Sequence, residues 1–184
     1  SLRLVQEAPE ELQGKSPEEP LQGPPDLDTA FASYAPYVAS LGQRILGRQS
    51  EVEDLVQDVF LQAHRSWSQL REAGATKGWL ARITVRMASR RLRTRRLRRW
   101  LHLDEGHPHG ELVAPGASPE QRALLARVYE MLDGLSADQR LAWTLRHVEG
   151  EPLAEVARLC ACSLSTAKRR VQAAQIELER GVRS

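Results

Sequence analysis

Apolar residues recur along most of this chain with the spacing of amphipathic helices. In residues 52–63 they fall three, four, seven and eight positions apart, at Val52, Leu55, Val56, Val59, Phe60 and Ala63. This spacing places them on one face of an α-helix. The opposite face carries an acidic and amide set, Glu53, Asp54, Gln57 and Asp58. We therefore predict a helix with one side in the core and one side able to meet a basic partner, or simply solvent.

A helix is also predicted before this segment. Apolar side chains follow helical spacing from Phe31 to Leu46, and Asp28 or Thr29 is a suitable N-cap. Pro36 lies inside the pattern, and a proline in a helix interior removes one hydrogen bond and disturbs the preceding turn. We expect this helix either to kink at Pro36 or to begin later.

The boundaries of the next two helices follow from capping signals. Ser50 followed by Glu53 is the pattern of a capping box, so the second helix is expected to start there and to run through Trp67. Residues 68–76 are polar and contain a glycine, which predicts a loop. A third helix is expected over 77–100.

The C-terminal part shows a second group of helical patterns. Ser118, Pro119 and Gln121 combine an N-cap, a favourable first helical residue and a capping box. The buried face expected for that helix is Leu124, Leu125, Val128, Met131 and Leu132. Ser136 is predicted to cap the next helix, with Leu141, Ala142, Leu145 and Val148 facing inward. The last two helices are expected over 153–159 and 163–181.

Together these patterns predict an all-α protein with two small helical domains joined by a flexible linker. Only 5 % of the residues are aromatic, and no stretch alternates at the period of a strand. Proline and acidic residues dominate the N-terminus, which indicates a disordered tail. The predicted parts are a tail at 1–28, a helical domain at 29–100, a linker at 101–117 and a second helical domain at 118–184.

Composition narrows the class of protein. No apolar run reaches the roughly 18–20 residues that span a bilayer, and no signal-peptide pattern stands out, so a cytoplasmic protein without membrane insertion is expected. The only cysteines, Cys160 and Cys162, are too close in sequence for a favourable mutual disulfide and cannot form a zinc site alone. No catalytic triad, paired carboxylate site or glycine-rich phosphate loop is evident, so neither catalysis nor a cofactor is predicted.

Charge is distributed unevenly although the formal net charge is only +2. Residues 1–28 hold two basic residues against seven acids, a net charge of −5, whereas residues 71–100 hold ten arginines and one lysine against one glutamate, a net charge of +10. So basic a block favours a polyanionic partner, most commonly nucleic acid. The cations predicted to contact DNA from this helix are Lys77, Arg82, Arg86, Arg90, Arg91 and Arg93.

Residues 153–171 have the pattern of a helix-turn-helix. A short helix is followed by a tight connection through Ala161, and Ser163 can cap the second helix. In this motif the N-terminal residues of the second helix reach base edges in the major groove. Hydroxyl and cationic side chains suit that task, and they stand here at Ser165, Thr166, Lys168, Arg169 and Arg170.

In combination, these motifs resemble the extracytoplasmic-function (ECF) group of bacterial RNA polymerase sigma factors, over residues 29–181. The resemblance rests on V-E-D-L-V-Q-D-V-F-L-Q-A-H-R-S-W at 52–67, on W-L-A-R-I-T-V-R-M-A-S-R-R-L-R at 79–93 and on the helix-turn-helix. It implies a region 2-like and a region 4-like domain that recognise the −10 and −35 promoter elements. It also implies that Glu53, Asp54, Gln57 and Asp58 contact the β′ clamp helices of core polymerase.

The same resemblance implies further roles. The loop 70–78 would capture an extruded base during promoter melting, the C-terminal domain would meet the β flap, and an anti-sigma factor would hold the chain inactive. The chain departs from the family's usual residues at Thr76, Arg86 and Arg90, where an aromatic residue, asparagine and aspartate are common. It also departs at Ser136–Ala137, Ala161 and Ser165–Lys168. These differences bear on which promoter sequence is read.

Two other functions remain open from the residues alone. A stand-alone helix-turn-helix regulator would bind duplex DNA without polymerase, but it leaves the acidic face of residues 52–60 without a role. A small metal-dependent enzyme could use His102, His107 and His109, although no helix or strand pattern fixes their geometry. Metal analysis of the purified chain would separate this last function from the others.

Overall fold

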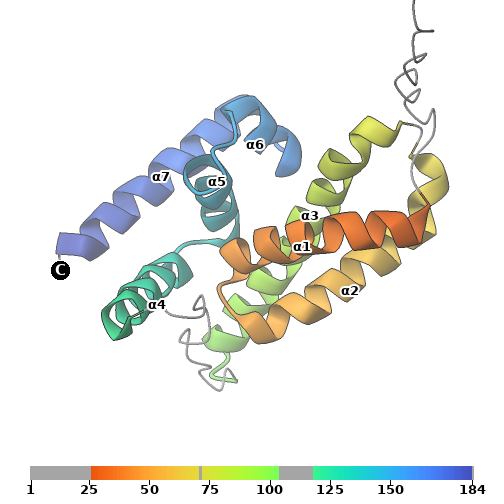
Figure 1. Ribbon diagram of the computed structural model, residues 1–184. Coiled ribbons are helices and arrows are strands. Elements are labelled where there is room, and N and C mark those ends of the chain that lie inside the picture. Colours follow the sequence, from red (N-terminus) through yellow and green to blue (C-terminus); the bar gives the residue numbers. More distant parts are fainter. Residues whose placement is uncertain (1–25, 71, 104–117, 184) are drawn as a thin grey trace, which may run out of the picture.

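The structure, a computed structural model, describes residues 26–70, 72–103 and 118–183, and this part of the chain is helical without strands (Figure 1). The all-α prediction is confirmed. The elements are α1 (Leu27–Leu46), α2 (Gln49–Ser66), the 3₁₀ turns η1 (Trp67–Gln69) and η2 (Ala73–Ala75), α3 (Thr76–Trp100), α4 (Pro119–Gly134), α5 (Ala137–His147), α6 (Leu153–Leu159) and α7 (Leu164–Arg183). Most of the predicted tail and linker lies outside the described residues. None of the described helices is long and apolar enough to cross a bilayer.

The start of α1 differs from the expectation. The N-cap is Asp26, whose carboxylate accepts a hydrogen bond from the Thr29 backbone N–H at 2.9 Å, so neither Asp28 nor Thr29 caps the helix. The helix also continues through Pro36, so the expected later start is wrong. Pro36 is exposed, and the carbonyl four residues earlier that loses its partner belongs to the exposed Ala32. Solvent can satisfy that carbonyl, which explains why the helix tolerates the proline.

The turn between α1 and α2 is built on Gly47. Its φ of +71° is left-handed, which glycine adopts without a steric penalty. A Cβ at this position would also lie 2.3 Å from Cδ1 of Tyr129, so the C-terminal half of the chain packs directly on the turn. The predicted capping box of Ser50 and Glu53 is wrong: the N-cap of α2 is Arg48, and its side chain makes no capping hydrogen bond.

The capping signals of the C-terminal helices are confirmed. Ser118 with Gln121 and Ser136 with Gln139 both form complete capping boxes. The predicted buried face of α4 is only partly right, because Leu124 is 65 % exposed while Tyr129 and Leu132 are buried. Val128 and Val148 are likewise exposed rather than inward-facing. The buried face of α4 is therefore shifted by about one residue from the predicted face.

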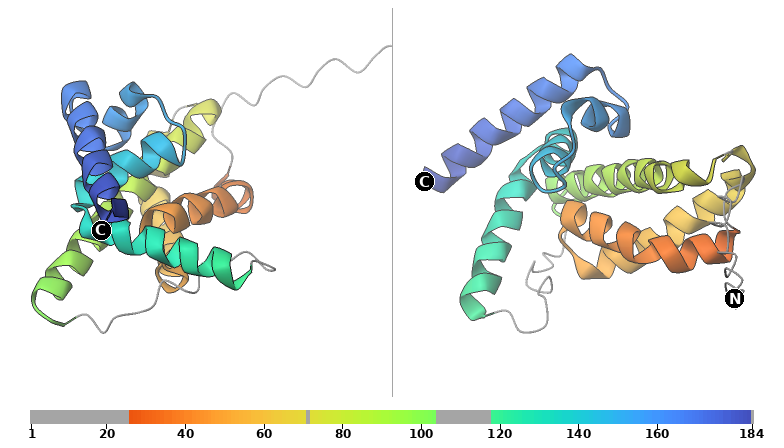
Figure 2. Two further views of the ribbon diagram at one scale, coloured as in Figure 1. Left: turned by 90° about the vertical axis from the view of Figure 1, so that its left-hand side faces the viewer. Right: turned by 45° about the horizontal axis from the view of Figure 1, so that its top comes forward.

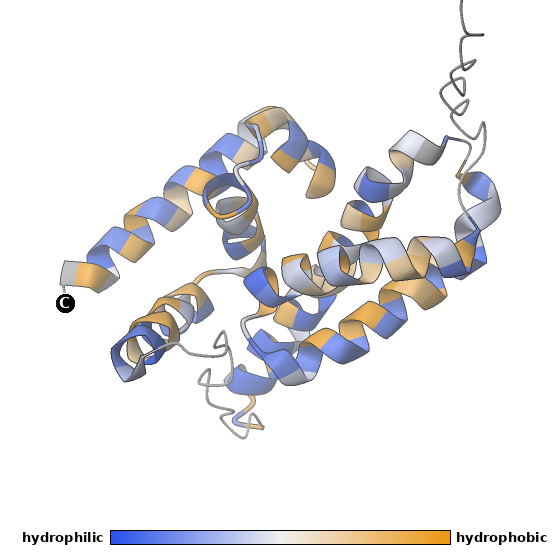
Figure 3. Ribbon diagram, in the orientation of Figure 1, coloured by the Kyte–Doolittle hydropathy of each residue, from blue (hydrophilic) through white to orange (hydrophobic). Residues whose placement is uncertain are grey.

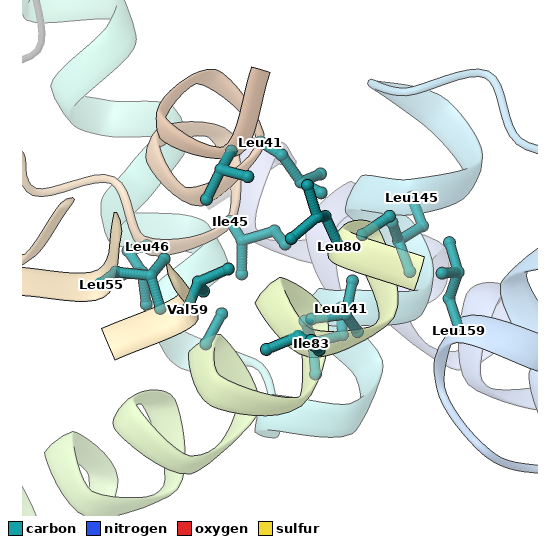
Figure 4. Packing of buried hydrophobic residues seen from close by; sticks show 14 of the residues in the cluster. Leu41, Ile45, Leu46, Leu55, Val59, Leu80, Ile83, Leu141, Leu145 and Leu159 are labelled. Carbon is teal, nitrogen blue, oxygen red and sulfur yellow. The ribbon is translucent and has the colours of Figure 1, made fainter. Parts of the chain in front are cut away.

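One hydrophobic core extends through both halves of the described chain. Leu41, Ile45, Leu55, Val59 and Leu80 from α1–α3 belong to the same buried cluster as Leu141, Leu145 and Leu159 from α5 and α6 (Figure 4). Hydrophobic and hydrophilic residues alternate along the helices as amphipathic elements require (Figure 3). Helices α4 and α7 extend away from the α1–α3 bundle in the right-hand view of Figure 2. The division at residues 29–100 and 118–184 stays a prediction, and the two halves are packed together rather than apart.

Buried ions join the halves where α1 ends. Arg140, only 1 % exposed, donates hydrogen bonds to the carbonyl oxygens of Ile45 (2.8 Å) and Leu46 (2.9 Å) and to Asp133. Arg95 also donates to the Leu46 carbonyl, at 3.0 Å. A helix end leaves its last carbonyls without partners inside the helix, and cations stabilise it. Burial lowers the pKa of Arg140 to about 10, against the attraction of Asp133, so its guanidinium remains charged at neutral pH.

Candidate nucleic-acid interface

The acidic side of α2 is presented to solvent. Glu53, Asp54, Gln57 and Asp58 are all exposed, while Val52, Leu55, Val59 and Phe60 are buried beneath them. The amphipathic pattern therefore placed these four residues correctly on the outer face. Leu61 lies three residues after Asp58 on this face and is 58 % exposed. Leu61 was not among the predicted contacts, although its place outside the apolar face of 52–63 indicates exposure.

The predicted basic side of α3 is also on the surface. Arg82, Arg86, Arg90 and Arg93 are exposed, and the first three recur every four residues, so they follow one side of the helix. Lys77 lies 4.8 Å from the centre of the Tyr37 ring, which places its ammonium over an aromatic face. These residues can present positive charge to a phosphate backbone along α3.

Arg91 has a different environment from the other predicted DNA contacts. Its guanidinium donates to the carboxylate of Asp58 at 2.5 Å and to the main-chain oxygen of Glu51 at 3.3 Å. The side chain is mostly buried, at 23 % exposed. Arg91 thus ties the basic helix to the acidic face of α2, and any contact with DNA would compete with the Asp58 pair.

The loop before α3 has little aromatic surface to offer. Thr76 stands where the resembled family commonly has an aromatic residue, and it is fully buried at the start of α3. Trp79 instead packs edge-on against Trp67, with ring centroids 5.6 Å apart. Among the described residues of this loop, Glu72, Gly74 and Ala75 are the exposed ones. A base held here would meet small or polar groups.

The helix-turn-helix is present as predicted. Ala161 turns the chain between α6 and α7 with a φ of +50°, a left-handed conformation that costs alanine more than glycine. Ser163 caps α7, because its hydroxyl accepts a hydrogen bond from the Thr166 N–H at 3.2 Å. At the start of α7, Ser165, Lys168 and Arg169 are exposed and Thr166 is partly exposed. These side chains are free to approach a groove.

One carboxylate joins the two predicted DNA-binding helices. Asp138, in the first turn of α5, accepts from Arg93 of α3 at 2.8 Å and from Arg170 of α7 at 2.6 Å. The sequence assigned these two arginines to different promoter elements. A cavity of about 410 Å³ lies beside them, between the basic side of α3 and the turn of the helix-turn-helix. In this arrangement the two basic surfaces face each other.

The cysteines pack against the hydrophobic core without a disulfide. Burial, followed by the neighbouring Cys162, raises the pKa of the Cys160 thiol to about 12. No group of three His, Cys, Asp or Glu able to hold a metal occurs within 26–70, 72–103 and 118–183. Two of the three histidines considered above, His107 and His109, lie outside those ranges. The metal hypothesis therefore stays untested.

Comparison with known proteins matches both halves to one family. The family model "Sigma-70 region 2" matches residues 30–98 and "Sigma-70, region 4" matches residues 125–175. The chain is 30 % identical over 158 residues to the ECF RNA polymerase sigma factor SigE of Mycolicibacterium smegmatis, covering 84 % of this chain and 60 % of that protein. It is 30 % identical over 156 residues to the ECF RNA polymerase sigma-E factor of Haemophilus influenzae, covering 79 % and 82 %.

Solved structures share the fold. The sigma factor RpoE, solved with the anti-sigma factor NepR from Bartonella quintana, superposes with a TM-score of 0.61 at 23 % identity, covering 86 % of this chain and 97 % of that chain. CnrH, solved in complex with the cytosolic domain of CnrY, superposes with a TM-score of 0.57 at 21 % identity, covering 84 % and 85 %. Both similarities extend over the two halves of the described chain.

Proposed function

This chain belongs to the ECF group of RNA polymerase sigma factors, and we propose that it binds core polymerase and directs it to specific promoters in the cytoplasm of a bacterium. The observation that carries the proposal is the pairing of an exposed acidic face on α2 with two basic helices, inside matches to both sigma regions. A stand-alone DNA-binding regulator would need only the basic helices. We propose no catalytic step for this chain.

The polymerase contact is assigned to the outer face of α2. Gln57 and Asp58 each lie about one helical turn after Asp54. The three side chains can therefore meet basic and amide groups of the β′ clamp helices together. Exposed Leu61 extends the same face and would add apolar contact at its end. Glu53 is exposed beside them and would contribute long-range attraction. Charge complementarity of this kind mainly raises the association rate and sets specificity.

The DNA contacts are assigned to two helices. Lys77, Arg82, Arg86, Arg90 and Arg93 of α3 would hold phosphates at the −10 element, and Arg91 would join them if its pair with Asp58 opens. The start of α7 would read the −35 element through Ser165, Thr166, Lys168, Arg169 and Arg170. Each good bidentate contact to a base edge contributes about 1–3 kcal/mol of discrimination. Exposing a base from the duplex costs a few kcal/mol, which contacts to polymerase and to the melted strand would offset.

The described arrangement must open for this function. The −10 and −35 elements are about 25 base pairs apart, or about 85 Å of B-form DNA. In this structure, however, Arg93 and Arg170 share the carboxylate of Asp138. One body cannot place these side chains on both elements at once. We propose that binding to polymerase, including contact of the region 4-like half with the β flap, separates the two halves.

An anti-sigma factor is proposed as a further partner. The structurally similar sigma factor RpoE was solved with the anti-sigma factor NepR, and CnrH was solved with the cytosolic domain of CnrY. Co-purification from the native host would test this, and a chain that is free and constitutively active would count against it.

Run-off transcription tests the function directly. Core polymerase with this chain should start transcripts at a specific promoter, whereas core polymerase alone should not. One variant replaces Arg86 and Arg90 by glutamine. Its control replaces exposed Arg65 of α2 by glutamine. Loss of transcripts only in the first variant supports the proposed −10 contacts. A gel shift separates the alternative: tight binding of duplex promoter DNA by the chain alone, with no transcripts from core polymerase, would indicate a stand-alone regulator.

A further inference from the structure

A cavity of about 450 Å³ lies between the beginning of α2 and the second half of α3. Four arginines of α3 line it, Arg90, Arg91, Arg95 and Arg98, together with Arg48 before α2. The acids in its lining are Glu51 and Asp54. Five guanidinium groups against two carboxylates leave a formal excess of three positive charges in a space of nucleotide size.

The charges in this cavity are only partly compensated. Glu51 is shared, at 2.7 Å from Arg95 and 3.6 Å from Arg48. Outside the lining, Asp58 pairs with Arg91 at 2.5 Å and Asp133 lies 3.5 Å from Arg95, which reduces the excess of positive charge. Arg90 and Arg98 are exposed, and neither forms an ion pair with the residues that the structure describes. These two side chains are therefore available to an anion from outside.

A buried donor in the cavity also lacks an acceptor. The Arg95 side chain is 4 % exposed, and its terminal nitrogens bind the Leu46 carbonyl and the Glu51 carboxylate. Its Nε, however, has no hydrogen-bond partner within the described chain. This nitrogen is closed off from solvent, so Arg95 contributes its positive charge to the cavity rather than a direct contact through Nε.

The start of α2 adds to the same field. Its N-cap, Arg48, offers no side-chain oxygen, so the side-chain cap normally found at such a position is missing beside the cavity. The N-terminus of a helix carries partial positive charge and unsatisfied N–H groups, which favour anions. The hydroxyls of Ser50 and Thr94 lie in the cavity lining as further donors.

We propose that this cavity binds an anion that carries two or more phosphate groups. Arg90 and Arg98 are eight residues apart on α3, about 12 Å along the helix axis, a spacing that successive phosphates of one molecule can bridge. Planar guanidinium groups bind phosphate oxygens in pairs. The same chemistry occurs in a nucleoside polyphosphate or inorganic polyphosphate and in a nucleic-acid backbone. The site shares Arg90 and Arg91 with the proposed −10 contacts and Asp54 with the proposed polymerase face, so its test uses Arg98, which belongs to neither.

Titration calorimetry of the full chain with tripolyphosphate, at constant ionic strength, tests the site. We expect one ion bound per chain, and about tenfold weaker binding by Arg98→Gln, since a charge-assisted contact is lost. Arg65→Gln is the matched control: it removes the same charge from an exposed position at the far end of α2. Equal weakening by both variants, or no saturable binding by the unaltered chain, would overturn the proposal. Sulfate in place of tripolyphosphate should bind far more weakly.

A labelled duplex oligonucleotide then identifies the source of the phosphates. If tripolyphosphate displaces the duplex and Arg98→Gln weakens both, the site holds nucleic-acid backbone. If Arg98→Gln weakens tripolyphosphate alone, the site belongs to a small polyphosphorylated molecule. Neither measurement includes polymerase, so the result stands apart from the success or failure of the transcription test.

Discussion

Replacing Asp138 by asparagine should strengthen DNA binding by the isolated chain. Asp138 accepts hydrogen bonds from Arg93 and Arg170, which belong to the two basic helices. Asparagine keeps the shape of the side chain but removes the charge that neutralises both guanidinium groups. The arginines would then pair with phosphates without first leaving a carboxylate.

The size of the effect follows from exposure. The side chains of Asp138, Arg93 and Arg170 are 33 %, 64 % and 24 % exposed, so solvent screens both pairs. Pairs of this kind contribute about 0.2–1 kcal/mol each, or about 0.4–2 kcal/mol together. If DNA must displace both, its affinity should rise roughly 2- to 30-fold. Asp138 also lies in the first turn of α5, so its neutralisation should cost up to about 1 kcal/mol of helix stability.

Fluorescence anisotropy with a labelled promoter duplex measures this change. It should be run at low and moderate salt, because phosphate contacts weaken as salt rises. The control is Glu130→Gln, which removes the same charge from an exposed position on α4. Tighter binding by Asp138→Asn than by Glu130→Gln is the expected result. Equal affinities for the two variants would show that the Asp138 pairs do not limit access to the basic helices.

Three further predictions concern stability and reactivity. Arg140→Met should destabilise the fold by about 3–5 kcal/mol, because it removes a buried cation that donates to Asp133 and to the carbonyls of Ile45 and Leu46, and Arg95 reaches only Asp133 and Leu46 among these acceptors. Calorimetry should show a melting temperature lower by about 6–20 °C, and a loss below about 1 kcal/mol would refute a structural role. Ala161→Gly should raise stability by about 0.5–1 kcal/mol, since φ is +50° there, and unchanged or lower stability in urea titrations would contradict that turn. The raised pKa of about 12 keeps the Cys160 thiol protonated up to strongly alkaline pH. In a Cys162→Ser background, alkylation of Cys160 should therefore be slow at pH 8 and fast once urea unfolds the chain, and equal rates would contradict its burial.

Much of the local structure could be predicted because local rules determine it. The capping boxes at Ser118 and Ser136 need only residues three positions apart, and the acidic face of α2 follows from periodicity within one helix. The same rules misplaced the starts of α1 and α2. Asp26 rather than Asp28 is the N-cap of α1. Helix α2 begins before Ser50 because the preceding turn is determined by Gly47 and by its contact with Tyr129, which lie outside the helix.

The contacts between the halves could not be predicted. Arg95 follows buried Leu92 by three residues and so lies on the inner face of α3, but an arginine in a basic block is normally expected in solvent. No local pattern indicates which acceptors Arg95 finds there, or that Arg140 reaches the end of α1. Asp138 was not singled out at all, since its role depends on two arginines 45 and 32 residues away. Long-range ion pairs have no periodic signal, so Arg91 and Arg93 were assigned to DNA without their carboxylate partners Asp58 and Asp138.

If α2 binds core RNA polymerase through its acidic face, reversing charges on that face should weaken binding. The measurement is the equilibrium affinity for purified core RNA polymerase of the chain with Asp54→Lys and Asp58→Lys, with Glu130→Lys on α4 as control. We predict a loss of at least tenfold for the double variant at 0.1 M salt, with the control within about twofold of the unaltered chain. Full-strength binding by the double variant, with its helices intact by circular dichroism, would contradict the account.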